Sequence, residues 1–382
     1  MNSWQRILMY TIGALLCACY APLNASAQPY LLKPGFDSRE CDAAYLLNAA
    51  FLDTSANNSF PGFLEGYTFW YRSPSIGLDN VYDLWLRQDS TVIITLRGTT
   101  ADARSIMADF YCAMFPAKGN IVLGKDKAPF TYKLATDAKA AVHGGFLISF
   151  AFIAQDFQPR LAELYQKGYR KFLVCGHSQG GALCYYISAW LMQLRKDNVY
   201  PGIKVKTYAS AAPKMGNIYF VYDYDNAMHG EWSYSIVNTA DPVPEMPLTT
   251  QQLEIDMNTP NPLVNLAKRF DDMPFFKRIV LKHAYNSMRK KARKSSEAYQ
   301  KYLGGYAGKI IKGMQPGMEL PDPVKTTYFL RPGVPITLLE NEAYREHFKA
   351  APNYFHHGFD AYRYLLRQYY EGLDDFSQAE KW

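Results

Sequence analysis

The order of apolar and polar positions divides the chain into alternating short and long elements. Short runs rich in β-branched and aromatic residues are typical of strands, whereas longer stretches with a helical apolar period are typical of helices. The predicted strands cover residues 68–71, 81–86, 91–96, 171–175, 205–209 and 234–238. The predicted helices cover residues 41–51, 145–168 and 181–194. An initial hairpin followed by repeated strands and helices indicates an α/β fold, with a mostly parallel sheet flanked by helices.

The composition of the chain excludes a disordered protein. Of the 382 residues, 48% are hydrophobic and 15% are aromatic, which is enough apolar surface to bury a large core. The sequence contains no internal repeat and no low-complexity linker. We therefore expect one large domain or two modest ones.

The first residues have the features of a secretory signal peptide. Arg6 precedes the apolar run 7–21, and Ala25-Ser26-Ala27 supplies the small residues of a cleavage site. We expect residues 1–27 to be removed from an exported protein that is secreted or periplasmic. The alternatives are an uncleaved membrane anchor and a lipoprotein acylated at Cys19. Beyond this segment, no run of about eighteen apolar residues predicts a membrane span.

Four cysteines remain outside the signal segment, which is too few for a disulfide scaffold. Cys175 and Cys184 lie in apolar stretches, where we expect buried free thiols. Cys41 and Cys112 are the pair that we consider as a bridge. Because no CxxC pair and no histidine cluster at metal spacing is present, we expect no metal site and no cofactor.

A serine between glycines stands where a predicted strand meets a predicted helix, in LVCGHSQGGALCYY (Leu173 to Tyr186). In a nucleophile elbow the serine lies on a sharp, strained turn, where bulky neighbours would clash. Gly176 and Gly180 remove those side chains, with His177 and Ser178 at the centre of the turn. We therefore predict that Ser178 is a nucleophile and that the backbone N–H of Gln179 is an oxyanion donor.

A serine hydroxyl needs a base to take its proton and a carboxylate to orient that base. After Ser178, the best-placed acid is Asp241 in SIVNTADPVPEMP, directly after a predicted strand and before two prolines that prevent a helix. The alternative interpretation of Asp241 is a turn-forming aspartate before proline.

Several segments in order resemble the class 3 lipases, a family of the α/β-hydrolase fold. The segments are ITLRGTT (94–100), Ala108-Asp109, VHGGF (142–146), LVCGHSQGGAL (173–183), TYASAAPKMGN (207–217) and VNTADPVPEMP (237–247). Together they lie within about residues 81–247. The resemblance implies an α/β-hydrolase domain over residues 28–382, with a catalytic serine, aspartate and histidine in that order.

The resemblance also implies an oxyanion residue and a lid. The residue after Arg-Gly in the family donates to the oxyanion, which assigns that role to Thr99 beside Gln179. A threonine chosen for its strand propensity is the alternative. The apolar stretch between residues 100 and 118 is similar to the family's lid, under which we expect acyl chains to bind. The predicted lid residues are Ile106, Met107, Asp109 and Phe110.

Four histidines follow Asp241 in the sequence, at positions 283, 347, 356 and 357. The stretch HHGFDAY is similar to the final His of the family, which is followed five residues later by Tyr. From His357 this spacing reaches Tyr362, so we choose His357 as the base, with His356 as its closest competitor. We expect His143 and His177 to be structural histidines beside the site.

The interval between Asp241 and His357 is longer than in the family, and it predicts a helical insertion over residues 250–325. Within it, residues 264–312 contain thirteen Lys or Arg and three acidic residues, while the whole chain is formally +6. The remainder of the chain is therefore formally −4. The insertion has two interpretations: a solvated helical cap, or a surface that docks on anionic lipid. We do not expect nucleic-acid binding, because no recognition motif accompanies the charge.

These features predict an exported serine carboxylester hydrolase that acts on lipid esters, either a triacylglycerol lipase or a phospholipase A1-like enzyme. One alternative is an esterase that acts on soluble or polysaccharide-linked acyl esters. The other is a lipid-binding surface protein that uses an inactive hydrolase fold.

Overall fold

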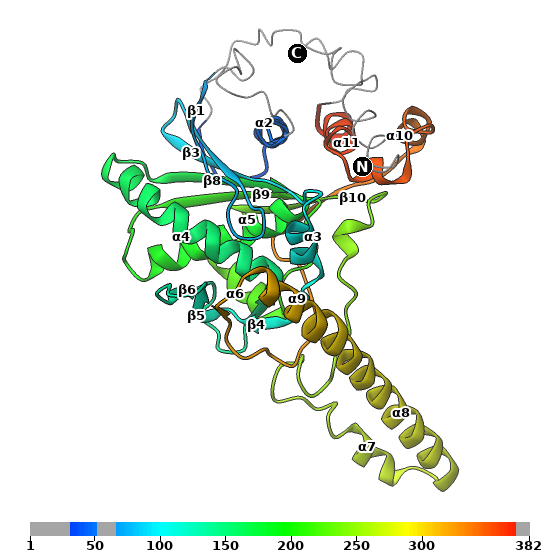
Figure 1. The fold of residues 1–382 in the computed structure, drawn as a ribbon. Helices are drawn as coiled ribbons and strands as arrows, with labels where there is room; N and C mark the ends of the chain where they lie inside the picture. Colours follow the sequence, from blue (N-terminus) through cyan, green and yellow to red (C-terminus); the bar gives the residue numbers. More distant parts are fainter. Residues whose placement is uncertain (1–30, 52–65, 372–382) are drawn as a thin grey trace, which may run out of the picture.

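A seven-stranded sheet forms the centre of the computed structural model, which describes residues 31–51 and 66–371 (Figure 1). The strand order is β1-β2-β3-β8-β9-β10-β12. The first three strands pair antiparallel and the remaining pairs are parallel. The strands are β1 (Tyr67–Arg72), β2 (Tyr82–Arg87), β3 (Thr91–Leu96), β8 (Lys171–His177), β9 (Lys204–Ser210), β10 (Ser233–Asn238) and β12 (Val334–Leu338). The predicted α/β fold with a mostly parallel sheet is confirmed.

Edge strand β12 was not predicted from the sequence. It pairs with β10, and Tyr234 lies opposite Val334 in the register. Pro335 lies inside this strand. Proline cannot donate a hydrogen bond to a ladder, so a strand that contains it is confined to an edge. The position of β12 at the end of the sheet satisfies that restriction.

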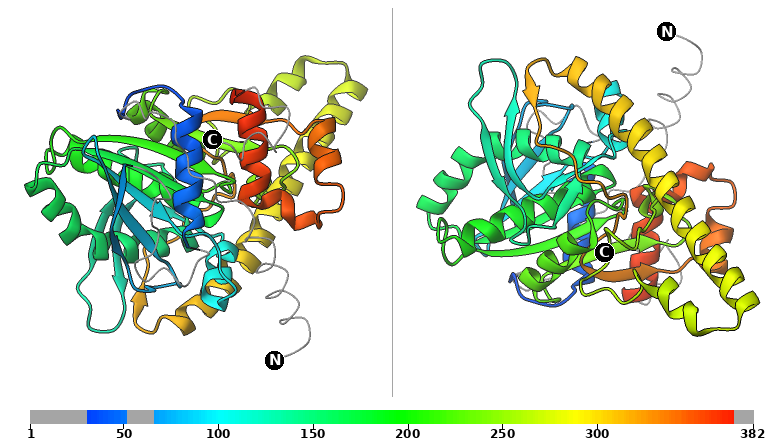
Figure 2. Two further views of the ribbon diagram at one scale, coloured as in Figure 1. Left: turned by 90° about the horizontal axis from the view of Figure 1, so that it is seen from above. Right: turned by 90° about the horizontal axis from the view of Figure 1, so that it is seen from below.

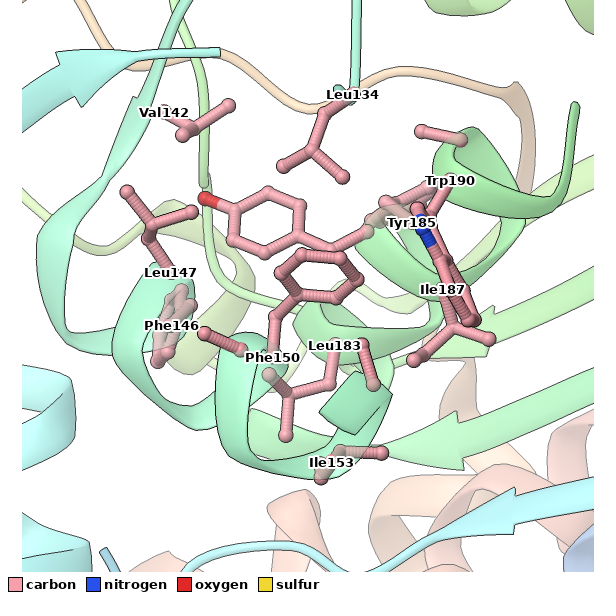
Figure 3. Packing of buried hydrophobic residues seen from close by; sticks show 14 of the residues in the cluster. Leu134, Val142, Phe146, Leu147, Phe150, Ile153, Leu183, Tyr185, Ile187 and Trp190 are labelled. Atoms are coloured by element: carbon pink, nitrogen blue, oxygen red, sulfur yellow. The ribbon is translucent and has the colours of Figure 1, made fainter. Parts of the chain in front are cut away.

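Helices cover both faces of the sheet. α4 (Gly144–Gln166), α5 (Gln179–Lys196) and α6 (Ile218–Met228) cover one face, and α2 (Ser38–Ala49) and α11 (Phe359–Glu371) lie side by side on the other (Figure 2). Aromatic and aliphatic side chains from α4 and α5 fill the space on the first face (Figure 3).

The central strands are apolar on both faces because both are covered. In β3, Val92 and Ile94 belong to the core beneath α4 and α5, whereas Ile93 belongs to the core beneath α2 and α11. All three side chains are at most 1% exposed. Successive side chains of a strand point to opposite faces, so a doubly covered strand reads as a continuous apolar run.

Two small sheets and several short helices complete the domain. β11 (Met318–Glu319), β5 (Lys118–Leu123) and β6 (Phe130–Lys133) form one small sheet, and β4 (Met114–Pro116) pairs with β7 (Ala141–His143). The short helices near the carboxyl ends of the strands are α3 (Ala103–Phe110), η1 (Val243–Glu245), α10 (Glu342–His347) and η4 (Asn353–His357).

The chain between β10 and β12 is mainly helical. Between η1 and β11 it forms α7 (Leu266–Arg269), η2 (Phe270–Asp272), α8 (Phe275–Tyr299), the π-helix η3 (Gln300–Tyr306) and α9 (Ala307–Met314). Figure 1 shows that α8 extends away from the sheet and its covering helices. No helix in the described residues has the length and apolarity that a membrane span requires.

The bridge that we considered between Cys41 and Cys112 is not formed. All four cysteines in the described ranges are free and buried, as expected for Cys175 and Cys184. Cys41 lies on α2 in the core that α2 and α11 cover, whereas Cys112 belongs to a separate small cluster with Met114. The two thiols thus lie in different parts of the core. The predicted signal peptide and Cys19 lie outside the described residues.

Candidate active site

Ser178 lies at the turn between β8 and α5. Its backbone φ of 60° and ψ of −127° are unusual for a residue other than glycine. The turn is fixed by a hydrogen bond of 3.0 Å from the Ser178 N–H to the carbonyl oxygen of Ser210 in β9. The half-buried Ser178 side chain reaches a cavity at the carboxyl end of the sheet. This is the geometry of a nucleophile elbow.

The two flanking glycines permit close contacts that no side chain would allow. A Cβ on Gly180 would overlap the carbonyl oxygen of Leu96 at the end of β3. A Cβ on Gly176 would overlap the carbonyl oxygen of Gly180 and approach the Cys184 sulfur at 2.9 Å. The helix α5 therefore packs directly on the strands because both positions lack side chains.

The structure brings His357 to Asp241 and both to the cavity that contains Ser178. Nδ1 of His357 lies 2.8 Å from Oδ2 of Asp241, although 116 residues separate them in the sequence. Asp241 follows β10 and its side chain is fully buried, whereas His357 ends η4 and is 25% exposed. Within the described residues, the Ser178 hydroxyl makes no hydrogen bond to His357. Such contacts are often long before substrate binds.

Tyr362 contributes a further contact to the same carboxylate. Its hydroxyl donates a hydrogen bond of 2.7 Å to Oδ2 of Asp241 from the first turns of α11. Burial raises the pKa of Asp241, but the hydrogen bonds from His357 and Tyr362 and the charge of His357 outweigh that effect. The pKa of Asp241 is therefore lower than its ordinary value, and the carboxylate is charged at neutral pH.

The neighbouring histidines point elsewhere. His356 accepts or donates a hydrogen bond of 2.7 Å with the Tyr344 hydroxyl, and its carbonyl oxygen accepts one of 3.1 Å from Asn238. Nε2 of His177 lies 2.6 Å from the carbonyl oxygen of His357, and its Nδ1 lies 3.0 Å from Oγ of Ser210. These contacts fix the backbone of His357.

Burial keeps His177 and His143 neutral. Burial is the largest cause that lowers the pKa of His177 to about 3, and the nearby His357 lowers it further. Burial likewise lowers the pKa of His143 to about 3, and its Nε2 lies 3.3 Å from Sγ of Cys112. Of the other histidines, His347 stacks on Tyr364, and His283 lies on the exposed part of α8.

Asp109 links the predicted lid segment to the predicted oxyanion residues. It accepts hydrogen bonds of 2.9 Å from the Thr99 hydroxyl and of 2.9 Å from Nε2 of Gln179. The same Gln179 amide donates to the carbonyl oxygen of Ser105 at 3.0 Å. Desolvation raises the pKa of Asp109 to about 6, although both hydrogen bonds and the charge of His357 act against it.

The predicted lid residues lie on α3. Ile106 is 39% and Phe110 is 52% exposed, and Met107 is half-buried. Ala108, on the inner side, is fully buried against α4, where a Cβ on Gly145 would overlap its carbonyl group. α3 therefore has an exposed apolar side beside the cavity and a tightly packed side against the core.

The cavity has a volume of about 710 Å³ and a mainly apolar lining. Ser178, Thr99 and His357 lie in its wall. The apolar part of the lining is Phe51, Phe110, Phe146, Pro213, Val243, Met246, Pro247, Leu248, Tyr299, Leu303 and Phe359. Among the described residues, no group of three or more His, Cys, Asp or Glu side chains could hold a metal ion.

Sequence reasoning did not assign roles to Tyr362 or to the Asp109 side chain. Tyr362 was noted only for its spacing from His357, and that spacing was the available signal. Asp109 was predicted only as a lid residue, and nothing in the local sequence indicated its contacts with Thr99 and Gln179.

The model of the family Lipase (class 3) matches residues 93–251, which include most of β3, the elbow and Asp241. This part of the chain is similar to the class 3 lipases. The match supports a lipase-type hydrolase that cleaves lipid esters. The matched residues contain Ser178 and Asp241, while His357 lies beyond them.

Similar proteins include a bacterial toxin and fungal lipases. A segment of 86 residues is 36% identical to Toxin TseL of Vibrio cholerae, and it covers 22% of this chain and 12% of the toxin. The structure of a fungal lipase-inhibitor complex is 20% identical, with a TM-score of 0.42, over 55% of this chain and 74% of that chain. The Lip2 lipase of Yarrowia lipolytica is 17% identical, with a TM-score of 0.41, over 57% of this chain and 77% of that chain.

Proposed function

We propose that this chain is a serine carboxylester hydrolase that acts on lipid esters, with Ser178 as the nucleophile. The observation that supports this proposal best is the contact of 2.8 Å between His357 and Asp241 beside a strained, cavity-lining serine. A buried carboxylate on Nδ1 of a histidine leaves Nε2 free to accept a proton. The proposed mechanism therefore needs no cofactor.

In this mechanism, Oγ of Ser178 attacks the ester carbonyl carbon while its proton moves to Nε2 of His357. The histidine returns the proton to the alcohol oxygen as the ester C–O bond breaks, which leaves an acyl-serine. Water then attacks the acyl-serine by the same proton transfers, and the acid is released. Asp241 keeps the ring of His357 oriented and stabilises its charged form.

We assign the oxyanion hole to the backbone N–H groups of Thr99 and Gln179. Within the described part of the chain, neither N–H donates a hydrogen bond to a protein acceptor. Gln179 is the first residue of α5, where the N–H groups have no partner within the helix and face developing negative charge. The Thr99 hydroxyl is already bound to Asp109, so we expect only its backbone N–H to act.

The apolar cavity supports a lipid acyl chain as the substrate group. A cavity of about 710 Å³ lies in the usual size range of small-molecule sites. Phe110, Met246 and Leu248 line it and are also 52%, 48% and 70% exposed. Such an apolar rim favours a substrate at a lipid surface. We therefore propose lipase or phospholipase A1-like activity, with α3 as a lid.

The test is hydrolysis of p-nitrophenyl esters from short to long chains, and of phospholipid vesicles. We expect Ser178→Ala and His357→Ala each to lower kcat by at least about a thousandfold. His356→Ala is the matched control, because its ring binds Tyr344 and not Asp241, and we expect its rate to stay near wild type. An increase in rate above the aggregation concentration of a long-chain ester would support the lid.

Other results would contradict particular parts of the proposal. A preference for short or sugar-linked acyl groups would indicate the soluble-ester esterase instead. If wild type and Ser178→Ala were equally inert on all substrates but bound lipid, the chain would be a lipid-binding protein and the hydrolase proposal would be wrong.

We also propose that residues 1–27 direct export. The support is the charged start, the apolar run and the small-residue site described above. N-terminal sequencing of exported protein from expressing cells tests this. A chain that begins at Gln28 would support cleavage, an acylated Cys19 would indicate the lipoprotein, and an intact N-terminus would contradict both.

A further inference from the structure

Residues 266–299, from α7 to the end of α8, form an extension that we call the basic arm (Figure 1). The arm contains ten Lys or Arg and three acidic residues. One side of α8 packs on the preceding chain: Tyr285 donates a hydrogen bond to the carbonyl oxygen of Leu263, and Ser296 is buried. The opposite side of α8 faces solvent.

Exposed apolar residues gather at the far end of this outer side. Phe276 is 81%, Val280 is 65% and Ile279 is 49% exposed. Residues three or four positions apart share one face of a helix, so these three side chains form a single patch. A patch of large apolar side chains at the tip of a projecting helix is unfavourable in water and marks a surface of interaction.

Basic residues continue the same outer face toward the body of the protein. At the helical spacing that begins with Phe276 and Val280, the face continues through His283 and Ser287 and then carries Lys290, Lys291 and Lys294. All three are exposed. In the described ranges, none of the three has a carboxylate within 4.0 Å. Three of the other seven arm cations form local ion pairs, in Lys282–Asp271, Arg289–Glu254 and Arg293–Glu297. The three lysines are therefore available for an external anion.

We propose that this outer face docks on the surface of a bilayer that contains anionic phospholipids. Phe276, Ile279 and Val280 would enter the headgroup region, and the three lysines would contact lipid phosphates. A helix with apolar residues beside lysines suits this interface, because each side chain reaches the layer that it prefers. A purely anionic polymer would use the lysines but would leave the apolar tip in water.

The arm is continuous with the wall of the cavity. The π-helix η3 follows α8 directly, and Tyr299 and Leu303, at the junction, line the cavity. The carbonyl oxygen of Leu303 accepts a hydrogen bond of 2.9 Å from the N–H of Cys112, just beyond α3. A docked arm therefore holds the cavity close to the bilayer. This consequence for turnover rests on the proposed function, but docking itself does not.

The test measures co-sedimentation with vesicles of phosphatidylcholine alone, or of phosphatidylcholine mixed with phosphatidylglycerol. All proteins carry Ser178→Ala, so that lipid is not consumed. Each lysine near an anionic surface strengthens binding about fivefold. We therefore expect Lys290→Gln, Lys291→Gln and Lys294→Gln together to weaken binding to the anionic vesicles about a hundredfold. High salt should have a similar effect on the protein without these arm changes.

The matched control removes three exposed lysines elsewhere, by Lys125→Gln, Lys127→Gln and Lys204→Gln. We expect it to lower binding by less than about threefold, because these lysines are not on the arm. The double change Phe276→Ser with Val280→Ser tests the apolar patch. We expect it to weaken binding at least tenfold relative to the unchanged arm, and we expect that difference to remain when both proteins are measured in high salt. Its control is Val199→Ser with Tyr222→Ser, at positions 54% and 52% exposed.

Several outcomes would overturn the docking proposal. They are equal binding to both vesicle types, equal losses in the arm and control lysine variants, or a dimer in sedimentation velocity that the arm changes dissociate. Hydrolysis of a soluble short-chain ester, in proteins that retain Ser178, separates the two proposals. If the arm variants keep that rate but lose vesicle binding, docking stands; if wild type lacks that rate yet binds vesicles, only the hydrolase proposal fails.

Discussion

The phenol of Tyr362 donates its hydrogen bond to Oδ2 of Asp241, the same oxygen that faces Nδ1 of His357. The two donors lie 2.7 Å and 2.8 Å from that oxygen. One buried carboxylate oxygen thus holds both the proposed base and the first turns of α11. This arrangement couples the packing of α11 to the orientation of the His357 ring.

We predict that Tyr362→Phe weakens both stability and turnover. A hydrogen bond to a charged group contributes about 1.5 to 3 kcal/mol, so the free energy of unfolding should fall by about that amount at pH 7. The pKa of Asp241 should rise toward its ordinary value, and kcat should fall about tenfold with little change in KM. Urea unfolding and the pH profile of kcat/KM measure these effects.

Tyr344→Phe is the control for this prediction. Tyr344 is also buried, but its hydroxyl binds His356 and Asn238. We expect Tyr344→Phe to lower the free energy of unfolding by a similar amount without shifting the acidic limb of the pH profile of kcat/KM. If both variants shifted that limb equally, Tyr362 would have no special effect on Asp241.

The pKa of Asp109, raised to about 6, predicts a pH-dependent stability. Because its pKa is raised in the fold, Asp109 binds a proton more tightly in the native state than in the unfolded chain. This difference stabilises the fold below the unfolded pKa of about 3.9, and the stabilisation is lost as the pH rises through the native pKa. Asp109→Asn should therefore increase the free energy of unfolding by about 1 to 2 kcal/mol at pH 8. The difference from wild type should vanish near pH 4. Thermal unfolding at several pH values tests this, and a gain that is constant with pH would contradict it.

We predict that Gly180→Ala disrupts the elbow. The added Cβ would overlap the backbone of Leu96, and the backbone on either side has no room to move. We expect a loss of at least about 3 kcal/mol in the free energy of unfolding and no measurable ester hydrolysis. Gly313→Ala is the control: a Cβ there meets no atom within 4 Å, so the helical propensity of alanine should add about 0.5 to 1 kcal/mol. Equal effects of the two changes would contradict the steric explanation.

A buried charge cluster behind the sheet predicts another large effect. The carboxylate of Glu40 binds Arg87 at 2.6 Å and Lys206 at 2.6 Å, and all three side chains are at most 4% exposed. Glu40→Gln leaves the buried Lys206 without its carboxylate, while Arg87 keeps Asp89 at 2.9 Å, so we expect a loss of about 3 kcal/mol. Glu163→Gln breaks the pair with Lys167, whose side chains are about half exposed, and should cost less than about 0.5 kcal/mol. Denaturant titration measures both, and a small effect of Glu40→Gln would show that the cluster tolerates a missing charge.

The strands and long helices of the fold could be predicted because their patterns are local. The predicted helix 145–168 is observed as Gly144–Gln166, and the predicted strand 171–175 as Lys171–His177. The small sheets were missed because their strands are short and carry little periodicity. The last strand was missed because Pro335 lies within it, and only its place at the edge of the sheet makes that proline acceptable.

The sequence by itself determined the elbow, since a strand, a turn with glycines and a helix lie within a few residues of one another around Ser178. It also determined Asp241 as a candidate, because a strand end and two prolines fix its loop. Only the tertiary structure decided which of His356 and His357 faces Asp241, what Asp109 binds and that Cys41 remains free. Adjacent residues in a short helix point in different directions. The ring of His356 binds Tyr344, whereas the ring of His357 meets Asp241, 116 residues away in the chain, because the packed sheet and helices bring those segments together.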